Sequence, residues 1–197
     1  MKLHPIPAYL LAASCAFDDL HAAAEAVATI RTMGIPVSRI ELLDEMSIRA
    51  FNHSLLSAGG EGCVNGAAES VADDHGSLRL KPMELRPTLF VEFASHSEMC
   101  AYEDLSAARN ICNDFGGMNF ASASDEYTRR ALWAARHRLY YSAIALRAGA
   151  GGDGDDDVGP TSRSTIVTDV CVPLSRFADI ITATADDVRE KGVVGPW

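Results

Sequence analysis

The residues best suited to chemistry lie on one predicted helix. They recur at steps of three and four residues and so share one face of it. This stripe consists of Trp133, Arg136, Tyr140, Ile144 and Arg147. An arginine between aromatic walls is a good carboxylate receptor, because its planar fork donates to both oxygens and partial desolvation strengthens the pair. The spacing therefore makes Arg136 a candidate anion-binding residue.

Each candidate also has a purely structural interpretation. Arg136 could stack on Trp133, or pair with Asp125 or Glu126. Arg147 is close to the predicted end of the helix, where a cation complements the helix dipole. Asp169 interrupts an apolar segment, where it is either a structural hydrogen-bond acceptor or part of a site.

Other motifs in the chain lack the neighbouring residues or elements that their function requires. Residues 149–154 match the pattern G-x-G-x-x-G, but a helix precedes them and the aspartates that follow would repel a pyrophosphate. Asp153, Asp155 and Asp157 are spaced as in a calcium loop, but the required glycine and glutamate positions hold Val158 and Ser164. The six histidines have no metal-ligand spacing, and no nucleophile motif occurs. We therefore predict no metal site and no catalytic nucleophile in this chain.

Composition limits the function classes. The 197 residues carry 17 Lys+Arg against 27 Asp+Glu, a net charge of −10, which disfavours binding to nucleic acid or an anionic membrane. No apolar run is long enough for a transmembrane helix. The five cysteines form no C-x-x-C pair, which favours a reducing compartment. Because Pro5 and Pro7 interrupt the N-terminal apolar stretch, we expect a buried strand there and no targeting segment.

Periodicity and capping residues predict alternating strands and helices. Strands are expected over 8–17, 39–43, 88–94, 119–123 and 165–172. Helices are expected from Asp18 or Asp19 to Gly34, and over 44–55, 97–115, 124–147 and 175–191. Two segments rich in glycine and charge, about 57–87 and 148–163, are predicted to be insertions.

This order contains two similar β-α-β units. It predicts an α+β fold with duplicated ferredoxin-like units, in which an antiparallel or mixed sheet has its helices on one face. The last residues, 192–197, have the character of a segment that leads into a further strand.

Four segments carry a family resemblance. They are Ile40–Glu45, Pro87–Phe93, Leu132–His137 and Thr168–Arg176. Their order and context are similar to those in FAD-linked oxidases of the D-lactate dehydrogenase (cytochrome) type. The resemblance covers nearly the whole chain apart from the two predicted insertions.

The resemblance implies a two-domain flavoenzyme, in which an FAD domain is followed by an α+β cap domain that holds the substrate. Residues 1–197 would then be part of the cap domain, with Lys2–Pro5 at the junction and the flavin domain absent. A motif of the type G-H-V-G-D-G-N, whose histidines serve a metal and the catalytic base, would follow Trp197. FAD and a divalent metal are thus expected in the complete protein, bound mainly outside this chain, which alone would be inactive.

The resemblance also suggests roles for single residues. Arg136, in the pattern Trp-x-x-Arg, resembles the arginine that receives the substrate carboxylate, and Tyr140, Trp133 and Arg147 would line the same pocket. Asp169 would lie near the flavin edge as a cofactor-binding residue. Relatives often have Arg-Pro-Gly where this chain has Arg147-Ala148-Gly149, which puts the geometry after the long helix in question.

The expected function is that of a substrate-binding cap domain in an FAD-dependent D-2-hydroxy acid dehydrogenase that oxidises D-lactate to pyruvate. Its partners would be a small 2-hydroxy acid and the FAD domain of the same protein, in mitochondria or cytoplasm. The alternative is a non-catalytic ferredoxin-like module for ligand binding or oligomerisation. The sequence leaves open which 2-hydroxy acid is used, the electron acceptor and the oligomeric state.

Overall fold

The computed structural model describes residues 5–57, 82–149 and 168–192. Its strands are β1 (Tyr9–Ala16), β2 (Val37–Leu43), β3 (Thr88–Ser95) and β4 (Met118–Ala123). Its helices are α1 (Leu20–Thr32), α2 (Glu45–Ser57), α3 (Glu98–Asp114), α4 (Glu126–Gly149) and α5 (Phe177–Glu190), the last preceded by a 3-10 turn, Leu174–Arg176. The first four predicted strands and all five predicted helices are therefore present, with ends that shift by a few residues.

The strands form one sheet in the order β2-β3-β1-β4, and all neighbouring strands are antiparallel. β1 and β3 pair along their full length, from Tyr9 opposite Ser95 to Ala16 opposite Thr88. In this order the two β-α-β units, β1-α1-β2 and β3-α3-β4, interleave so that β3 lies between β1 and β2. The predicted α+β class and ferredoxin-like arrangement are confirmed.

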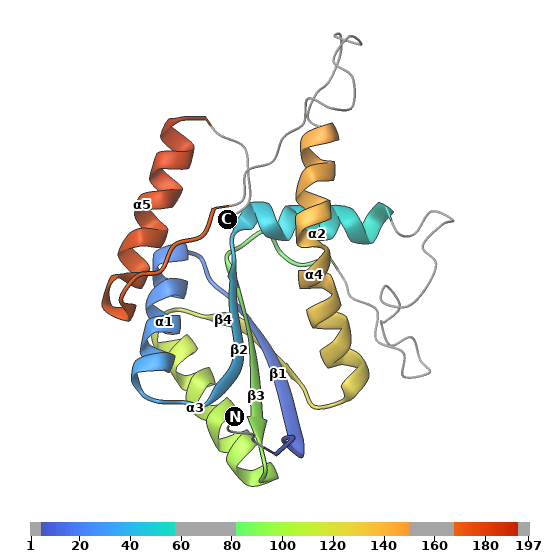
Figure 1. The fold of residues 1–197 in the computed structure, drawn as a ribbon, viewed down its shortest axis with the longest axis vertical. Helices are drawn as coiled ribbons and strands as arrows, with labels where there is room; N and C mark the ends of the chain where they lie inside the picture. The colour runs from blue at the N-terminus through green and yellow to red at the C-terminus, as the bar shows by residue number, and fades with distance from the viewer. Residues whose placement is uncertain (1–4, 58–81, 150–167, 193–197) are drawn as a thin grey trace.

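The helices lie on both faces of the sheet, which corrects the expectation of helices on one face only. α1, α3 and α5 cover one face, and α2 and α4 cover the other (Figure 1). The reason is topological. α1 and α3 are the crossovers inside the two units, whereas α2 and α4 lie outside them and are free to pack against the second face.

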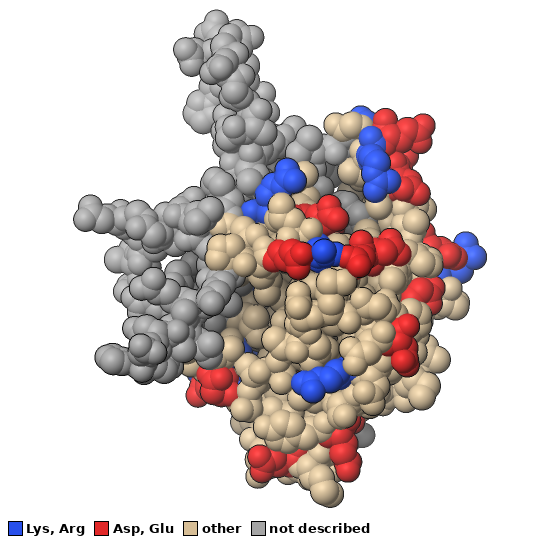
Figure 2. Space-filling view, turned by 180° about the vertical axis from the view of Figure 1, so that it is seen from behind, with Lys and Arg blue, Asp and Glu red and all other residues tan. Residues whose placement is uncertain are grey.

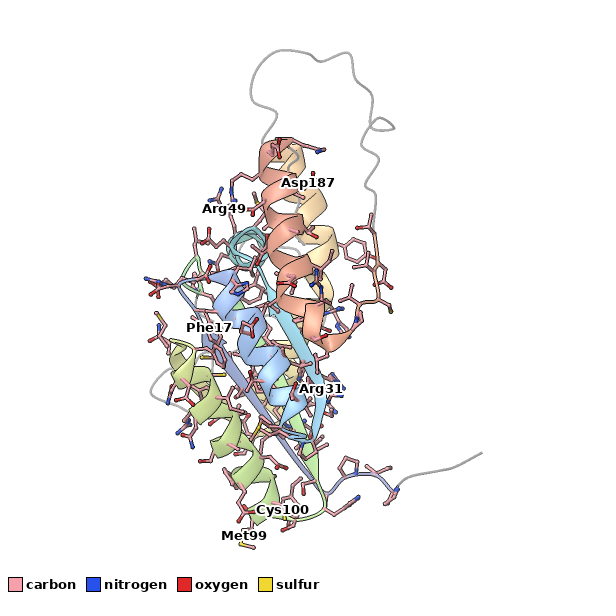
Figure 3. All side chains as sticks on the ribbon, turned by 90° about the vertical axis from the view of Figure 1, so that its left-hand side faces the viewer. Phe17, Arg31, Arg49, Met99, Cys100 and Asp187 are labelled. Carbon is pink, nitrogen blue, oxygen red and sulfur yellow. The ribbon has the colours of Figure 1, made fainter. Side chains whose placement is uncertain are left out.

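The alternation of β3 divides the core in two. Leu89, Val91 and Phe93 point toward α1 and α3, whereas Phe90 points toward α2 and α4. Phe17, which follows β1, is fully buried in the larger core on the α1–α3 side (Figure 3). Burial of each such side chain contributes about 1.5–3 kcal/mol, so this larger core supplies most of the hydrophobic stabilisation.

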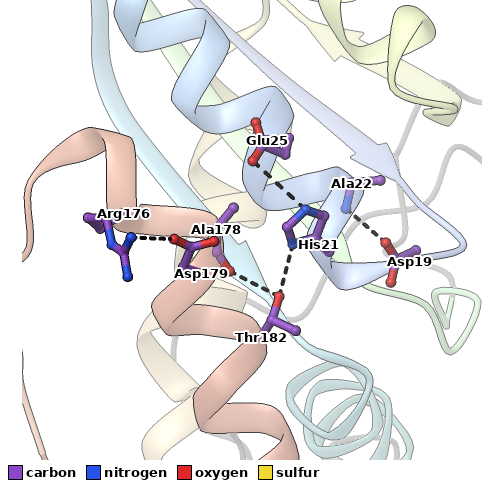
Figure 4. A network of polar contacts seen from close by, with 8 residues as sticks. All are labelled: Asp19, His21, Ala22, Glu25, Arg176, Ala178, Asp179 and Thr182. Atoms are coloured by element: carbon purple, nitrogen blue, oxygen red, sulfur yellow. Dashed lines mark hydrogen bonds and ion pairs between the residues drawn. The ribbon is translucent and has the colours of Figure 1, made fainter.

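Helix ends follow the capping residues. The Asp19 carboxylate accepts a hydrogen bond from the Ala22 N–H at 3.0 Å and begins α1, and Gly34, at φ +74°, follows its end. α5 docks on α1 through His21, whose Nδ1 is 3.0 Å from Thr182 Oγ1 (Figure 4). Thr182 in turn donates to the carbonyl of Ala178 at 3.0 Å, so the contact is anchored within α5.

The strand predicted over 165–172 is wrong where the structure describes it. Residues 168–173 have no regular secondary structure, and Val170 is 66% exposed. β-branched residues favour a strand only when a neighbouring strand and a packed face are available. Neither edge of the described sheet, β2 or β4, pairs with this segment. Residues 165–167 lie outside the described part.

The two predicted insertions fall largely outside the described residues, which exclude 58–81 and 150–167. Residues 82–87, the end of the first predicted insertion, have no regular secondary structure. They are hydrogen-bonded to the rest of the domain. Asn52 of α2 donates to the Met83 carbonyl at 2.7 Å and accepts from the Met83 N–H at 2.8 Å. The Pro87 carbonyl accepts from the Phe17 N–H at 2.8 Å.

Gly117, between α3 and β4, is predicted to tolerate no side chain. A Cβ there would lie 2.7 Å from both the Cys112 carbonyl oxygen and Cys15 Sγ. Gly117→Ala should lower the free energy of unfolding in urea by about 1–3 kcal/mol through overpacking. Gly34→Ala, where the space is open, should cost about 1–2 kcal/mol through the left-handed backbone alone. A Gly117→Ala protein as stable as the wild type would contradict this packing.

Candidate functional site

Charged residues collect where α4 crosses the second face of the sheet. We call this region the β2–β3–α4 face and define it by Arg39, Glu41, Glu92, Arg129, Trp133 and Arg136. Arg39 is the cross-strand partner of Glu92, and Glu41 is that of Phe90. Since side chains two residues apart along a strand point the same way, β2 and β3 present Arg39, Glu41 and Glu92 together toward α4.

The first turns of α4 are fixed by a cap and a small core. The Asp125 carboxylate accepts from the Thr128 N–H at 2.7 Å, and this hydrogen bond holds the pKa of the Asp125 carboxyl below its ordinary value. Three turns further along, Leu132, Trp133 and Leu139 pack against Leu43, Ile48 and Phe90. These contacts set the rotation of α4 on the sheet.

Glu92 is a buried carboxylate in the middle of β3, with only 4% of its surface exposed. Its Oε1 is 2.9 Å from Ser38 Oγ and 3.3 Å from Arg39 Nε, and its Oε2 is 3.7 Å from Arg129 Nη1. The Arg39 guanidinium also lies 5.1 Å from the centroid of the Trp133 ring. Glu92 thereby links β2, β3 and α4 through ionic contacts.

Arg136 lies at the rim of the same face, one turn after Trp133. Its Nη2 is 3.1 Å from Glu41 Oε1 and 3.2 Å from Glu41 Oε2. The side chains of Arg136 and Glu41 are 42% and 35% exposed. Arg136 is thus held at one nitrogen and open to solvent, unlike Arg129, whose side chain is 15% exposed.

The structural interpretations considered for Arg136 are replaced by other contacts. The ring of Trp133 is covered by Arg39, so the predicted stack is made by a different arginine. Asp125 caps α4, and Glu126 pairs with Arg130 at 2.5 Å, so neither is the partner of Arg136. The partner is Glu41, which is distant in the sequence.

The other predicted site residues are placed as follows. Trp133 is 7% exposed and lies inside the small core, so it is a wall of the site only through its edge. Tyr140 and Arg147 lie on α4, but their side chains are outside the described part of the structure. Asp169 is exposed, in the irregular segment before Pro173. The binding roles of these residues stay predictions.

Sequence reasoning missed Arg39, Glu41, Glu92 and Arg129, although a signal existed for two of them. Glu92 is the only charged residue in the apolar strand 88–94, and a buried acid requires a cationic partner. Glu41 alternates with apolar residues in β2 and therefore shares a face with Arg39. The partners themselves could not be identified, because they come from other elements.

The first turns of α1, α2, α3 and α4 do not fit an FAD phosphate site. A pyrophosphate is held by free backbone N–H groups, typically at a helix N-terminus. Here the first turns of α1, α2, α3 and α4 already donate to the side chains of Asp19, Asp44, Ser97 and Asp125. The N-termini of α1 to α4 are thus already capped, whereas α5 begins without a hydrogen bond to a capping side chain. Among the described residues, no three His, Cys, Asp or Glu side chains gather as metal ligands.

Charges of both signs are mixed over the surface. On the described part of the face shown in Figure 2, acidic and basic side chains are scattered among uncharged residues. The β2–β3–α4 face itself brings three arginines against two glutamates, so its local balance is positive although the chain is acidic. Within the described ranges no helix is both long and apolar enough to cross a bilayer.

Comparison with known proteins now identifies the family. Residues 6–195 match the family described as FAD linked oxidases, C-terminal domain. The chain therefore belongs to this family. It is 33% identical over 196 residues to a probable mitochondrial D-lactate dehydrogenase of Danio rerio. The match covers 100% of this chain and 32% of the relative.

Two further relatives carry similar names. A mitochondrial D-lactate dehydrogenase [cytochrome] of Arabidopsis thaliana is 27% identical over 98% of this chain and 28% of its own length. One of Kluyveromyces lactis is 26% identical over the same shares. The chain thus spans about a third of the length of these relatives.

The buried charge of Glu92 should be the most sensitive point of this face. Glu92→Gln leaves Arg129 without its ionic partner in a buried setting, so we expect a loss of about 3 kcal/mol in the free energy of unfolding. Glu41→Gln removes a half-exposed pair and should cost less than about 1 kcal/mol. Urea unfolding of the 197-residue chain measures both. Equal losses for the two variants would show that Glu92 does not link the elements.

Proposed function

We propose that this chain is the substrate-binding part of an FAD-dependent D-2-hydroxy acid dehydrogenase whose substrate is D-lactate. Membership of the FAD-linked oxidase family supports the flavin-dependent class. The names of the relatives, all D-lactate dehydrogenases and all mitochondrial, support the substrate and a mitochondrial location. In this proposal the flavin is held by another part of the same protein, which is the chain's main partner.

The observation that carries the proposal is the state of Arg136. A 2-hydroxy acid is recognised chiefly by its carboxylate, which requires a cation with more than one donor in a fixed orientation. Arg136 is held by Glu41 at one nitrogen and is 42% exposed. Its contribution would be to bind the acid and orient it for reaction, which is a positioning effect.

The wall beside Arg136 is suited to such a small substrate. Trp133, one turn earlier on α4, is held from below by the Leu43–Ile48–Phe90 core and from the side by Arg39. An aromatic edge next to one cation suits a small acid with a short apolar chain.

The first test uses the protein translated from the complete reading frame that contains residues 1–197. We expect it to purify with flavin absorbance and to reduce an artificial electron-accepting dye in the presence of D-lactate. The 197-residue chain alone should be colourless and inactive, because in this proposal the flavin is held by another part of the same protein. A complete protein without flavin, or one whose flavin no D-2-hydroxy acid reduces, would overturn the proposed function. So would a 197-residue chain that binds FAD and oxidises D-lactate.

Arg136 gives a second test in the same complete protein. Arg136→Lys keeps the charge but loses the planar fork, so KM for D-lactate should rise about 10- to 100-fold, the equivalent of a charge-assisted hydrogen bond worth about 1.5–3 kcal/mol. Arg130→Lys is the matched control, since Arg130 is an exposed arginine of α4 that pairs with Glu126. Equal KM values for the two variants would remove Arg136 from substrate binding.

A further inference from the structure

We infer that Glu41 is a positioning residue, which holds Arg136 by Nη2 so that the rest of the guanidinium is presented to the substrate carboxylate. This inference rests on the proposed function and adds to it the residue that sets the orientation of the receptor. It assigns a role to a strand residue that approaches the site from the sheet and not from α4.

The contacts of Arg136 support this assignment. Both Glu41 oxygens approach the same nitrogen, Nη2, at 3.1 and 3.2 Å. Nη1 and Nε form no hydrogen bond or ion pair with the side chains that the structure describes. A guanidinium has five N–H donors, so three of them, on Nη1 and Nε, remain for a ligand. Arg136 therefore binds the Glu41 carboxylate and still has donors for a second carboxylate.

The position of Glu41 on a paired strand also suits a positioning role. It lies in β2 between Ile40 and Leu42, which pack into the core on the opposite face of the sheet. β2 is paired with β3 from Val37 to Leu43, so the backbone at Glu41 is fixed. An arginine on an exposed helix turn samples many rotamers, and a carboxylate on a rigid strand limits them. Such pre-orientation lowers the entropy lost when the substrate binds.

The other arginines of the face show what a purely structural pair looks like here. Arg39 and Arg129 both converge on Glu92, which is 4% exposed and which Ser38 also contacts. Glu41 has Arg136 as its ionic partner, and its side chain is 35% exposed. The carboxylate of the Glu41–Arg136 pair is therefore more open than that of Glu92 to the solvent from which a substrate arrives.

The test measures steady-state kinetics of Glu41→Gln in the complete, flavin-loaded protein with D-lactate. The variant keeps the shape of Glu41 and loses its charge. We expect KM to rise about two- to fivefold, as for the loss of a partly exposed ion pair, with kcat within about twofold. Glu126→Gln is the matched control, because it removes a carboxylate from another arginine of α4, Arg130, away from this face. Its KM should equal that of the wild type.

A double-mutant cycle shows whether Glu41 acts through Arg136. In the Arg136→Lys background, Glu41→Gln should have little further effect on KM, because the fork that Glu41 orients is already gone. Additive effects in the cycle would overturn the inference. Thermal unfolding of each variant, within a few degrees of the wild type, shows that the fold is intact.

The remaining outcomes separate this inference from the proposed function. A lower KM in Glu41→Gln means that Glu41 competes with the substrate for Arg136, which overturns the positioning role and leaves the proposed function standing. An unchanged KM in Glu41→Gln with a raised KM in Arg136→Lys has the same consequence. Unchanged KM values in both variants would remove Arg136 from substrate binding, and with it the role of Glu41, whereas a complete protein whose flavin no D-2-hydroxy acid reduces would overturn the proposed function itself.

Discussion

The arrangement of this domain depends on one buried charge, the carboxylate of Glu92. A carboxylate that is almost fully removed from water must be compensated, or the fold loses several kcal/mol. Here the compensation comes from Arg39 on the neighbouring strand, from Arg129 on α4 and from the Ser38 hydroxyl. Because these partners belong to separate elements, their convergence fixes how α4 lies on the sheet, and with it the position of Arg136.

The two faces of the sheet have different tasks. One face is closed by α1, α3 and α5 over a large apolar core, in which Gly117 packs closely against Cys112 and Cys15. The hydrogen bond to Cys15, together with burial, keeps the pKa of the Cys112 thiol above its ordinary value, so it stays protonated there. The other face has a smaller core and an ionic rim. Stability is therefore concentrated on the first face.

Family membership and geometry point to one division of labour. The chain matches the C-terminal domain of FAD-linked oxidases, and the first turns of α1, α2, α3 and α4 donate to their own capping side chains. The redox group is accordingly expected elsewhere, while this domain offers an arginine on a rigid support. That support has two layers: Trp133 with its apolar neighbours, and Glu41 on β2. An oriented cation beside an apolar wall is the simplest receptor for a small hydroxy acid.

The sequence by itself determined the elements and the class of fold. Apolar periodicity, Asp18 or Asp19 and Ser97 as caps and Gly34 as a helix stop predicted the four strands and five helices of the structure, because these signals are local. It also placed Trp133 and Arg136 on one stripe of α4. It failed for the segment before Pro173, whose strand propensity finds no neighbouring strand in the described sheet.

Only the tertiary structure decided which face each helix covers and which charges meet. The partner of Arg136 is 95 residues away in the chain, at Glu41, and the arginine that stacks on Trp133 is Arg39. Periodicity states which residues share a face of one element. It carries no information on which face of another element lies opposite, because that depends on strand order, register and the rotation of α4 about its axis. Ion pairs between elements follow from those three, so they could be found only once the chain was folded.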